Sequence, residues 1–359
     1  MRFDRRTKCL IPRLVAVCML ALVGAQSAFA LKLEIQPSRR LGEQAQSDKI
    51  TQIRVAQQFG LAYLPLMIMR QFQLIENHAG RGGVSNIRVI WKRFPSGKVM
   101  NDALKAGLLD VAAGGVVPMM RRWDETRERN GVRGVAALSA MPLYLITRNP
   151  RVKTLADFTN EDRIALPAVK RSIQAVLLQM AAAQTFGEKN FQRLDKLTVS
   201  MAHPNAREAL LAGKDNITAH FTSPPYQYQE LKDPALHRVA NSERILGGPA
   251  TFTVLWTRPQ FRDANPRTYF IFVEALKEAM AILKRDRRTN AEIYIQQANS
   301  GLSVDFVHEV LARPEMRFGI APQNVMKYAR FLYSTGQIKR LPEEWTEFFF
   351  PEIHGEPGS

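Results

Sequence analysis

Cysteine is almost absent from this sequence, which contains only Cys9 and Cys18 among its 359 residues. Two cysteines exclude a disulfide-rich scaffold and a metal site held by several thiolates. Hydrophobic residues make up 46% of the chain and charged residues 23%, a balance that excludes disordered, collagen-like and coiled-coil proteins. At roughly 150 residues per domain, the length fits two compact units or one large bilobal unit.

Recognised catalytic motifs are also absent. The sequence has no G-x-S-x-G nucleophile elbow, no phosphate-binding P-loop and no G-x-G-x-x-G dinucleotide motif. Of its six histidines, no two have the spacing of metal ligands on a helix. His220, beside Phe221 in a predicted strand, is interpreted as a core histidine. Asp110 fits a site acid or, better, a turn residue after Gly107. Nothing in these patterns requires an enzyme, a cofactor or a metal.

Long hydrophobic runs are missing as well. The apolar run Leu14–Val23 is too short for a membrane-spanning helix, which needs about 20 residues. It follows a basic segment and precedes Ala28 and Ala30, which are small residues at the −3 and −1 positions of a cleavage site. The pattern predicts a signal peptide over residues 1–30, cleaved after Ala30. An uncleaved N-terminal anchor helix is the alternative.

Cleavage after Ala30 would remove both cysteines and leave 45 basic against 32 acidic residues, a formal charge of +13. The positive charges are scattered rather than gathered into a basic arm, so nucleic acid is not predicted as a partner. The densest cluster, residues 121–133, mixes arginines with acidic residues and is typical of a solvated helix face. It could also steer an anionic ligand. The predicted product is an exported, periplasmic protein.

An internal repeat indicates two similar halves. Residues 103–118 can be aligned with residues 209–224 at a constant offset of 106, and both copies contain the pattern A-L-x-A-G. Upstream, Arg54–Ala56 matches Arg163–Ala165 at an offset of 109. The alternative is chance, because A-L-x-A-G is a common helix ending. The matching order of strands and helices around both copies favours two related α/β lobes.

The pattern of strands and helices predicts the fold class: an α/β protein with two lobes, each a mostly parallel sheet flanked by helices, and a ligand cleft between them. Predicted strands cover residues 53–56, 87–91 and 109–113, and predicted helices cover residues 63–75 and 98–106. The apolar runs 136–147 and 250–257 are interpreted as two crossings between the lobes. The predicted limits are a flexible N-terminus at 31–49, lobe 1 at 50–143 and 250–345, lobe 2 at 144–249, and a C-terminal tail at 346–359, loose from Pro351.

Ligands of open parallel sheets lie at the carboxyl ends of strands and at helix N-termini, where unpaired N–H groups favour negative charge. This rule selects the candidate ligand-binding residues Gln58, Phe59, Gly60, Tyr63, Ser96, Gly97, Gly114, Gly115, Val116, Lys170, Arg171, Ser172, Thr222, Ser223, Tyr226 and Thr251. Lys170 and Arg171 place two cations at a helix start, where a bound anion would compensate them. The alternatives are simple capping, tight turns, core packing of the aromatic rings and solvent exposure of the cations.

The sequence resembles the substrate-binding proteins of the nitrate/sulfonate/taurine class of ABC importers, which have the type II periplasmic binding protein fold. The segments that carry the resemblance are Ile53–Ala56, the loop and helix Gln58–Leu66, Ser96-Gly97, Asp102–Val111 and Lys153–Phe158. The resemblance covers roughly residues 50–340. A glycine typical of the family is missing where Asn160-Glu161-Asp162 stands, so that turn is expected to differ.

The resemblance implies a protein without a reaction or cofactor of its own. Such a protein captures a small anionic solute, for example nitrate, a sulfonate or taurine, and delivers it to an ABC permease and its ATPase. It touches the membrane only through the permease and acts as a monomer. Two alternatives remain open: an enzyme similar to the thiamine-pyrimidine synthase family, which depends on cysteine and histidine, and a periplasmic ligand-sensing domain.

Overall fold

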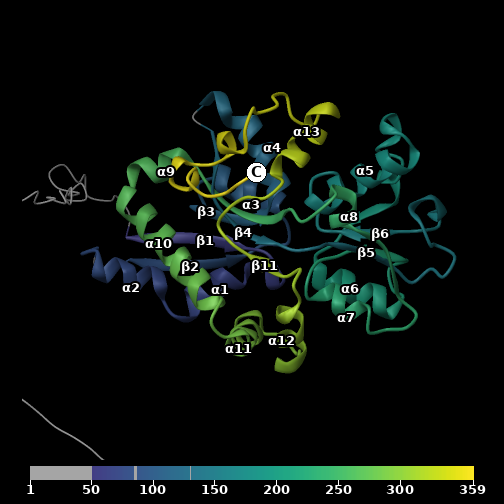
Figure 1. Ribbon diagram of the computed structural model, residues 1–359, viewed down its shortest axis with the longest axis horizontal. Coiled ribbons are helices and arrows are strands. Elements are labelled where there is room, and N and C mark those ends of the chain that lie inside the picture. Colours follow the sequence, from purple (N-terminus) through teal and green to yellow (C-terminus); the bar gives the residue numbers. More distant parts are fainter. Residues whose placement is uncertain (1–50, 85–86, 130) are drawn as a thin grey trace, which may run out of the picture. The chain divides into compact units, whose positions relative to one another are not determined.

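The computed structural model describes residues 51–84, 87–129 and 131–359 (Figure 1). The predicted signal peptide and the segment 31–49 lie outside the described residues. Within the described ranges, no helix combines the length and the apolar character that a membrane crossing needs. The described residues contain two β-sheets with helices packed around them.

The first sheet has six strands in the order β11-β4-β10-β3-β1-β2. Their bounds are Gln52–Gln57 for β1, Arg88–Arg93 for β2, Val111–Gly115 for β3, Arg133–Ala140 for β4, Thr251–Thr257 for β10 and Arg317–Phe318 for β11. β1 pairs in parallel with β2 and β3, whereas β10 runs antiparallel between β3 and β4. Every residue of β3 and β10 is buried, as expected for central strands covered on both faces.

The second sheet has five strands in the order β7-β6-β8-β5-β9. Their bounds are Tyr144–Thr147 for β5, Ile164–Leu166 for β6, Thr198–Ser200 for β7, Ala219–Phe221 for β8 and His237–Asn241 for β9. β6 pairs in parallel with β7 and β8, and β5 runs antiparallel between β8 and β9. The two sheets therefore share an arrangement of five strands, in which one antiparallel strand lies among parallel ones, and the first sheet adds the antiparallel edge strand β11.

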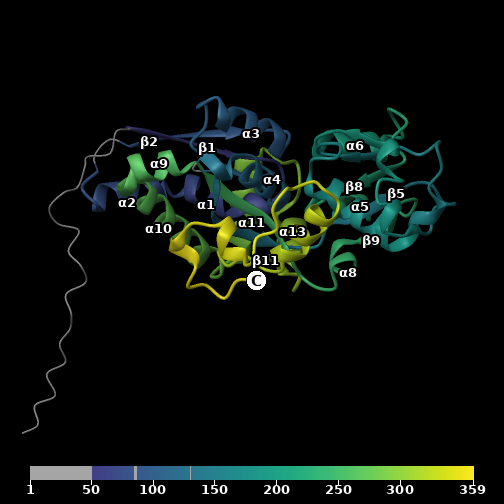
Figure 2. The same cartoon turned by 90° about the horizontal axis from the view of Figure 1, so that it is seen from above.

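This shared arrangement confirms the predicted fold class of two α/β lobes. We call the first sheet with its helices lobe 1 and the second sheet with its helices lobe 2. In Figure 1 and Figure 2 the teal elements of lobe 2 gather on one side, apart from the purple, blue and yellow elements of lobe 1. The chain passes to lobe 2 through Met141–Leu143 and returns through Gly247–Ala250. The exact domain limits stay predictions.

Helices surround both sheets. In lobe 1 they are α1 (Leu64–Gln71), α2 (Leu74–Arg81), α3 (Gly97–Lys105), α4 (Val116–Thr126), α9 (Pro259–Ala264), α10 (Pro266–Leu283), α11 (Arg287–Ala298), α12 (Val304–Ala312) and α13 (Val325–Ser334). In lobe 2 they are α5 (Ile173–Phe186), α6 (His203–Ala212), α7 (Tyr226–Glu230) and α8 (Ser242–Leu246). Short 3₁₀ helices are η1 (Leu61–Tyr63), η2 (Arg127–Arg129), η3 (Leu155–Asp157), η4 (Glu188–Asn190), η5 (Asp195–Leu197), η6 (Trp345–Phe348) and η7 (Pro351–Ile353).

Three local expectations need correction. The predicted helix 63–75 is divided, because Gln73 adopts a left-handed conformation between α1 and α2 and α2 then packs against α10. The run 136–147 crosses between the lobes as predicted, with β4 and β5 in different sheets, but the run 250–257 forms β10 within the first sheet instead of a crossing. The segment after Pro351 is not loose: Ile353 is buried, and the Ser359 carbonyl accepts a hydrogen bond of 2.8 Å from the Val325 N–H.

A partly buried ion pair fixes the turn between α3 and β3 in lobe 1. The Arg54 guanidinium donates to both Asp110 carboxylate oxygens, at 2.8 and 2.7 Å, and to the Gly107 carbonyl at 2.6 Å. The Arg54 backbone N–H donates to the same carboxylate at 2.8 Å. Asp110 is thus the turn residue that its position after Gly107 favours, because its carboxylate is used to attach this turn to β1.

We expect Asp110→Asn to lower the free energy of unfolding by about 2 kcal/mol, because the amide leaves a half-buried guanidinium without its carboxylate. The matched control is Asp102→Asn on α3. Its carboxylate is 65% exposed and pairs with the exposed Lys98, so the loss should stay below about 0.5 kcal/mol. Urea denaturation of both variants measures the difference, and equal losses would contradict a structural role for the pair.

Candidate functional site

A small cavity lies between the two lobes. Its lining residues are Gln58, Phe59, Tyr63, Gly97, Gly115, Pro118, Pro167, Ser172, Ile173, Gln174, His203 and Phe252. They come from the segments that follow β1, β3 and β6, and from the starts of α3, α5 and α6. The carboxyl ends of parallel strands and the N-termini of helices from both lobes therefore meet at one place, as binding sites of open α/β sheets do.

The cavity is narrow. Its volume is about 20 Å³, which is room for roughly one water molecule. The lobes touch beside it, where the Leu61 N–H donates to the Pro224 carbonyl at 3.0 Å. Gly60 adopts a φ of 110°, and a Cβ there would lie 2.8 Å from the same carbonyl oxygen. Only glycine combines this backbone conformation with such a close approach.

Ten of the sixteen predicted residues lie at or beside this cavity. Gln58, Phe59, Tyr63, Gly97, Gly115 and Ser172 line it. Gly60 and Ser223 meet at the contact between the lobes. Gly114 packs against the Gln58 side chain, and the Tyr226 ring stacks on His203 with centroids 5.7 Å apart. The residues that the rule selected come from loops far apart in the chain, and the fold brings these ten together. Whether they contact a ligand stays a prediction.

The other six predicted residues do not line the cavity. Lys170 and Arg171 are exposed, and the Arg171 guanidinium lies 3.7 Å from the Glu125 carboxylate. The Thr251 hydroxyl accepts a hydrogen bond from the Gln323 N–H at 2.8 Å, so it holds a later segment of lobe 1. The remaining three, Ser96, Val116 and Thr222, are buried.

The polar groups of the cavity are mainly hydrogen-bond donors. The Gln58 amide donates to the Tyr63 hydroxyl at 3.0 Å, and burial raises the pKa of Tyr63, so this phenol keeps its proton. The Ser172 hydroxyl caps α5 by accepting from the Ala175 N–H at 3.2 Å, which leaves its own proton available. The first-turn N–H groups of α3, α5 and α6 have no helical carbonyl to pair with, and they carry partial positive charge.

Sequence reasoning missed a buried chain of three titratable groups behind the cavity. The Glu230 carboxylate lies 2.7 Å from Nδ1 of His220, and Nε2 of His220 lies 2.8 Å from Nδ1 of His203. The far nitrogen of His203 lies 3.1 Å from the Gln174 amide nitrogen. The internal repeat contained part of the signal, because at an offset of 106 His220 occupies the place of Gly114, a predicted site glycine. The structure adds that His203 and Gly97 are each the first residue of their helix, α6 and α3.

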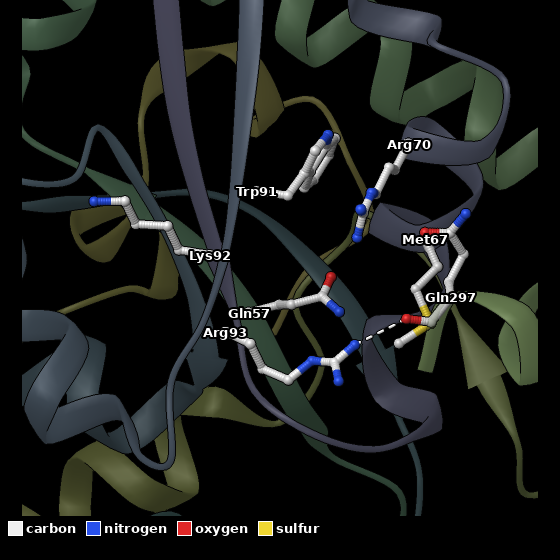
Figure 3. Close-up of a pocket in the computed structure, with 7 residues that line it drawn as sticks. All are labelled: Gln57, Met67, Arg70, Trp91, Lys92, Arg93 and Gln297. Carbon is white, nitrogen blue, oxygen red and sulfur yellow. Dashed lines mark hydrogen bonds between the residues drawn. The ribbon is translucent and has the colours of Figure 1, made fainter. Parts of the chain in front are cut away.

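A second, larger cavity of about 110 Å³ is lined by Gln57, Met67, Arg70, Trp91, Lys92, Arg93 and Gln297. In Figure 3 Arg70 and Arg93 point into it, whereas Lys92 points away. Arg93 donates to the Gln297 carbonyl at 2.9 Å, and its guanidinium lies over the Phe59 ring at 5.4 Å. All its lining residues belong to lobe 1, and none was predicted as a site residue. The interlobe cavity is therefore the better candidate for the functional site.

Among the described residues, no group of three or more histidine, cysteine, aspartate and glutamate side chains is arranged to hold a metal ion. The chain of His203, His220 and Glu230 fits this result. Its ring nitrogens and its carboxylate are directed at one another and not at a common point.

Solved structures share this fold. No protein-family model matches the chain, and no curated protein matches it. The alkanesulfonate-binding protein SsuA from Xanthomonas axonopodis pv. citri, bound to MOPS, aligns with a TM-score of 0.63 and 21% identity over 83% of this chain and 96% of that one. The periplasmic aliphatic sulphonate binding protein SsuA from Escherichia coli aligns with a TM-score of 0.59 and 18% identity over 83% of this chain and 98% of that one. The ligand binding component of an ABC-type import system from Staphylococcus aureus aligns with a TM-score of 0.61 and 15% identity over 85% of this chain and 98% of that one.

The similarity to these structures shows that the described residues have the two-lobed fold of periplasmic binding proteins. It agrees with the two-sheet topology and with the repeat. At these sequence identities the comparison shows the fold alone, so the function has to be argued from the geometry of the interlobe cavity.

We expect Gly60→Ala to destabilise the protein by about 1–3 kcal/mol, because alanine is strained at this φ and its methyl group meets the Pro224 carbonyl. Gly80→Ala on α2 is the control. A Cβ there meets nothing within 4 Å, and alanine should stabilise the helix by roughly 0.5–1 kcal/mol. Chemical denaturation followed by circular dichroism compares the two variants. A Gly60→Ala protein as stable as the parent would show that the lobes do not meet at this point.

Proposed function

We propose that this protein is the solute-binding component of an ABC importer and captures a small anionic solute between its lobes. The observation that carries the proposal is the composition of the interlobe cavity. Its lining residues include no carboxylate, and helix N-termini from both lobes surround it. Backbone N–H groups at helix starts, together with hydroxyl and amide donors, form a site that prefers an anion.

The absence of basic side chains from the cavity lining also bears on the class of solute. No lysine or arginine lines it, so a bound anion is held by neutral donors and helix dipoles. Such a site suits a singly charged oxyanion better than a multiply charged one, because each extra charge taken from water needs its own compensation. A sulfonate group fits this requirement, and two of the structural neighbours are named for sulfonates. Nitrate fits the same requirement.

The lobes must separate for a solute to enter, because the narrow cavity has room for about one water molecule. The two connections through Met141–Leu143 and Gly247–Ala250 are the natural hinge. Gly247 and Gly248 both have positive φ values, of 67° and 143°, which side chains would disfavour. Affinity then comes from contacts that both lobes make only when closed around the solute.

The proposal includes export to the periplasm through the predicted signal peptide, and action as a monomer with a permease and its ATPase. A sensing role would use the same capture step. An enzyme of the thiamine-pyrimidine synthase type would need reactive cysteine and histidine residues. No cysteine occurs after residue 18, so this alternative has no support from the cavity.

The decisive experiment is ligand identification. Native mass spectrometry of the purified protein reveals any co-purified solute. A thermal-shift screen then compares methanesulfonate, taurine and nitrate in a buffer free of sulfonates. A bound solute raises the melting temperature by mass action. A screen of small anions in which none shifts the melting temperature, with no co-purified solute, would contradict the proposed function.

Tyr63→Phe removes a buried hydroxyl from the cavity, and we expect it to weaken binding of the solute about fivefold to tenfold, because one hydrogen bond is worth about 1 kcal/mol. Tyr328→Phe on α13 is the matched control: this tyrosine is also buried but lies outside the cavity, so affinity should stay unchanged. Calorimetric titration measures both, and equal affinities would remove Tyr63 from the site.

The double variant Lys170→Ala with Arg171→Ala tests the cations that the sequence placed among the candidates. Both side chains are exposed and outside the cavity lining, and exposed charges are screened by salt. We expect a change of less than about twofold in affinity at physiological ionic strength. A loss of tenfold or more would place these residues in direct contact with the solute.

A further inference from the structure

The chain Glu230–His220–His203 connects a buried carboxylate to the wall of the interlobe cavity. The side chains of Glu230 and His220 are fully buried, and His203, at the start of α6, is 6% exposed and lines the cavity. The three groups are joined by hydrogen bonds of 2.7 and 2.8 Å. One end of the chain therefore faces the site, and the other end lies in the core of lobe 2.

Hydrogen-bond donors and acceptors along such a chain must alternate. In the state shown by the Gln174 contact, the amide nitrogen of Gln174 donates to Nε2 of His203. Nδ1 of His203 then donates to Nε2 of His220, and Nδ1 of His220 donates to the Glu230 carboxylate. Both rings are neutral, the carboxylate carries the only charge of the chain, and His203 presents an acceptor to its cavity-side neighbours.

One added proton reverses every bond of the chain. If Nε2 of His203 takes a proton, Nδ1 of His203 becomes the acceptor, Nε2 of His220 becomes the donor, and Nδ1 of His220 accepts from a protonated Glu230. The chain then carries no charge, and His203 presents an N–H donor. The two states differ by one proton and by the polarity of the hydrogen bond offered at the cavity.

The surroundings favour storage of the extra proton on Glu230. Burial raises the pKa of Glu230 well above its usual range, against the opposing effects of Arg207 and the Thr222 hydroxyl. Burial lowers the pKa of His220 to about 3 and, together with His220, lowers the pKa of His203. The rings therefore stay neutral in both states.

Other elements also place charged or titratable groups near this chain. The Tyr226 ring of α7 stacks on His203, and Tyr226 is hydrogen-bonded to Tyr294 of α11. Burial raises the pKa of Tyr226 to about 12 and also raises the pKa of Tyr294, so both phenols keep their protons. Arg93 of β2 and Arg207 of α6 supply positive charge close to Tyr226. Neither tyrosine competes with Glu230 for the proton.

We propose that an anionic solute binds in the interlobe cavity together with one proton, which converts the Glu230–His220–His203 chain from its acceptor state to its donor state. This inference rests on the proposed capture of an anion at that site. Because a protonated Nε2 of His203 can no longer accept from the Gln174 amide nitrogen 3.1 Å away, that amide turns aside and the N–H of His203 donates a hydrogen bond to the anion. The carboxylate charge behind it disappears at the same time. A cation or a neutral hydrogen-bond donor would instead favour the acceptor state, so the chain also selects against such solutes.

The test uses the complete mature protein and methanesulfonate, taurine and nitrate as probes. Proton uptake is recorded with a glass electrode in weakly buffered salt solution, and the dissociation constant is measured from pH 5 to pH 9. We expect uptake that approaches one proton per bound anion. Affinity should fall about tenfold per pH unit once the pH exceeds the value at which the free chain loses its proton, and should level off below that value.

Glu230→Gln removes the titrating carboxylate while keeping its shape, so affinity should no longer vary with pH and no proton should be taken up. Glu309→Gln, on the exposed face of α12, is the control that keeps the full pH dependence. Should Glu230→Gln fail to fold, ¹⁵N spectra of the unaltered protein give the same answer, because Nε2 of His203 must change from unprotonated to protonated when the anion binds.

Anion binding without proton uptake, or with the same pH dependence in Glu230→Gln, would overturn this inference and leave the proposed function intact. Absence of binding by all three probes at every pH, with no co-purified anion, would contradict the proposed function, and the inference would fall with it.

Discussion

The geometry of the interlobe cavity depends on one close contact between the backbones of the two lobes. The Leu61 N–H and the Pro224 carbonyl are hydrogen-bonded across it, and Gly60 leaves no room for a side chain. Because this contact lies beside the cavity, it determines how near the helix starts of the two lobes come to each other. The anion of the proposed function would be stabilised from both sides only while the backbones remain this close.

The two lobes share an order of five strands, to which lobe 1 adds β11, but they fill the space at corresponding positions with different side chains. In lobe 1 the positions at the start of α3 and in β3 are Gly97 and Gly114, and the Trp256 ring lies against both. In lobe 2 the corresponding positions are His203 and His220, whose own rings occupy the space and bond to each other. One half of the repeat therefore has glycines covered by an apolar ring at these positions, and the other has the histidine pair for which we propose a change of protonation.

Much of the fold could be predicted from the sequence, because the repeat and the order of strands and helices are local patterns that both copies reproduce. The cavity was predicted less completely. The rule for strand ends depends only on topology, and Gln58, Tyr63 and Ser172, which it selected as ligand-binding residues, line the cavity; contact with a ligand stays a prediction. It could not show that Lys170 and Arg171 are exposed, because the direction of a loop side chain depends on how the whole loop packs. His220 was correctly interpreted as buried, but its partners are distant in the sequence.

The charge of the protein and the composition of its cavity point to a division of roles. The chain carries 50 basic and 33 acidic residues, so its long-range field attracts anions, and Arg93 lies within cation–π distance of the cavity-lining Phe59. The residues that line the cavity include no lysine, arginine, aspartate or glutamate. A fixed cation inside would bind an anion strongly in the open state as well as in the closed one, and release would then be slow. In the proposed capture, neutral donors would bind weakly one by one and strongly together, so affinity would depend on closure and a solute could leave when the lobes separate.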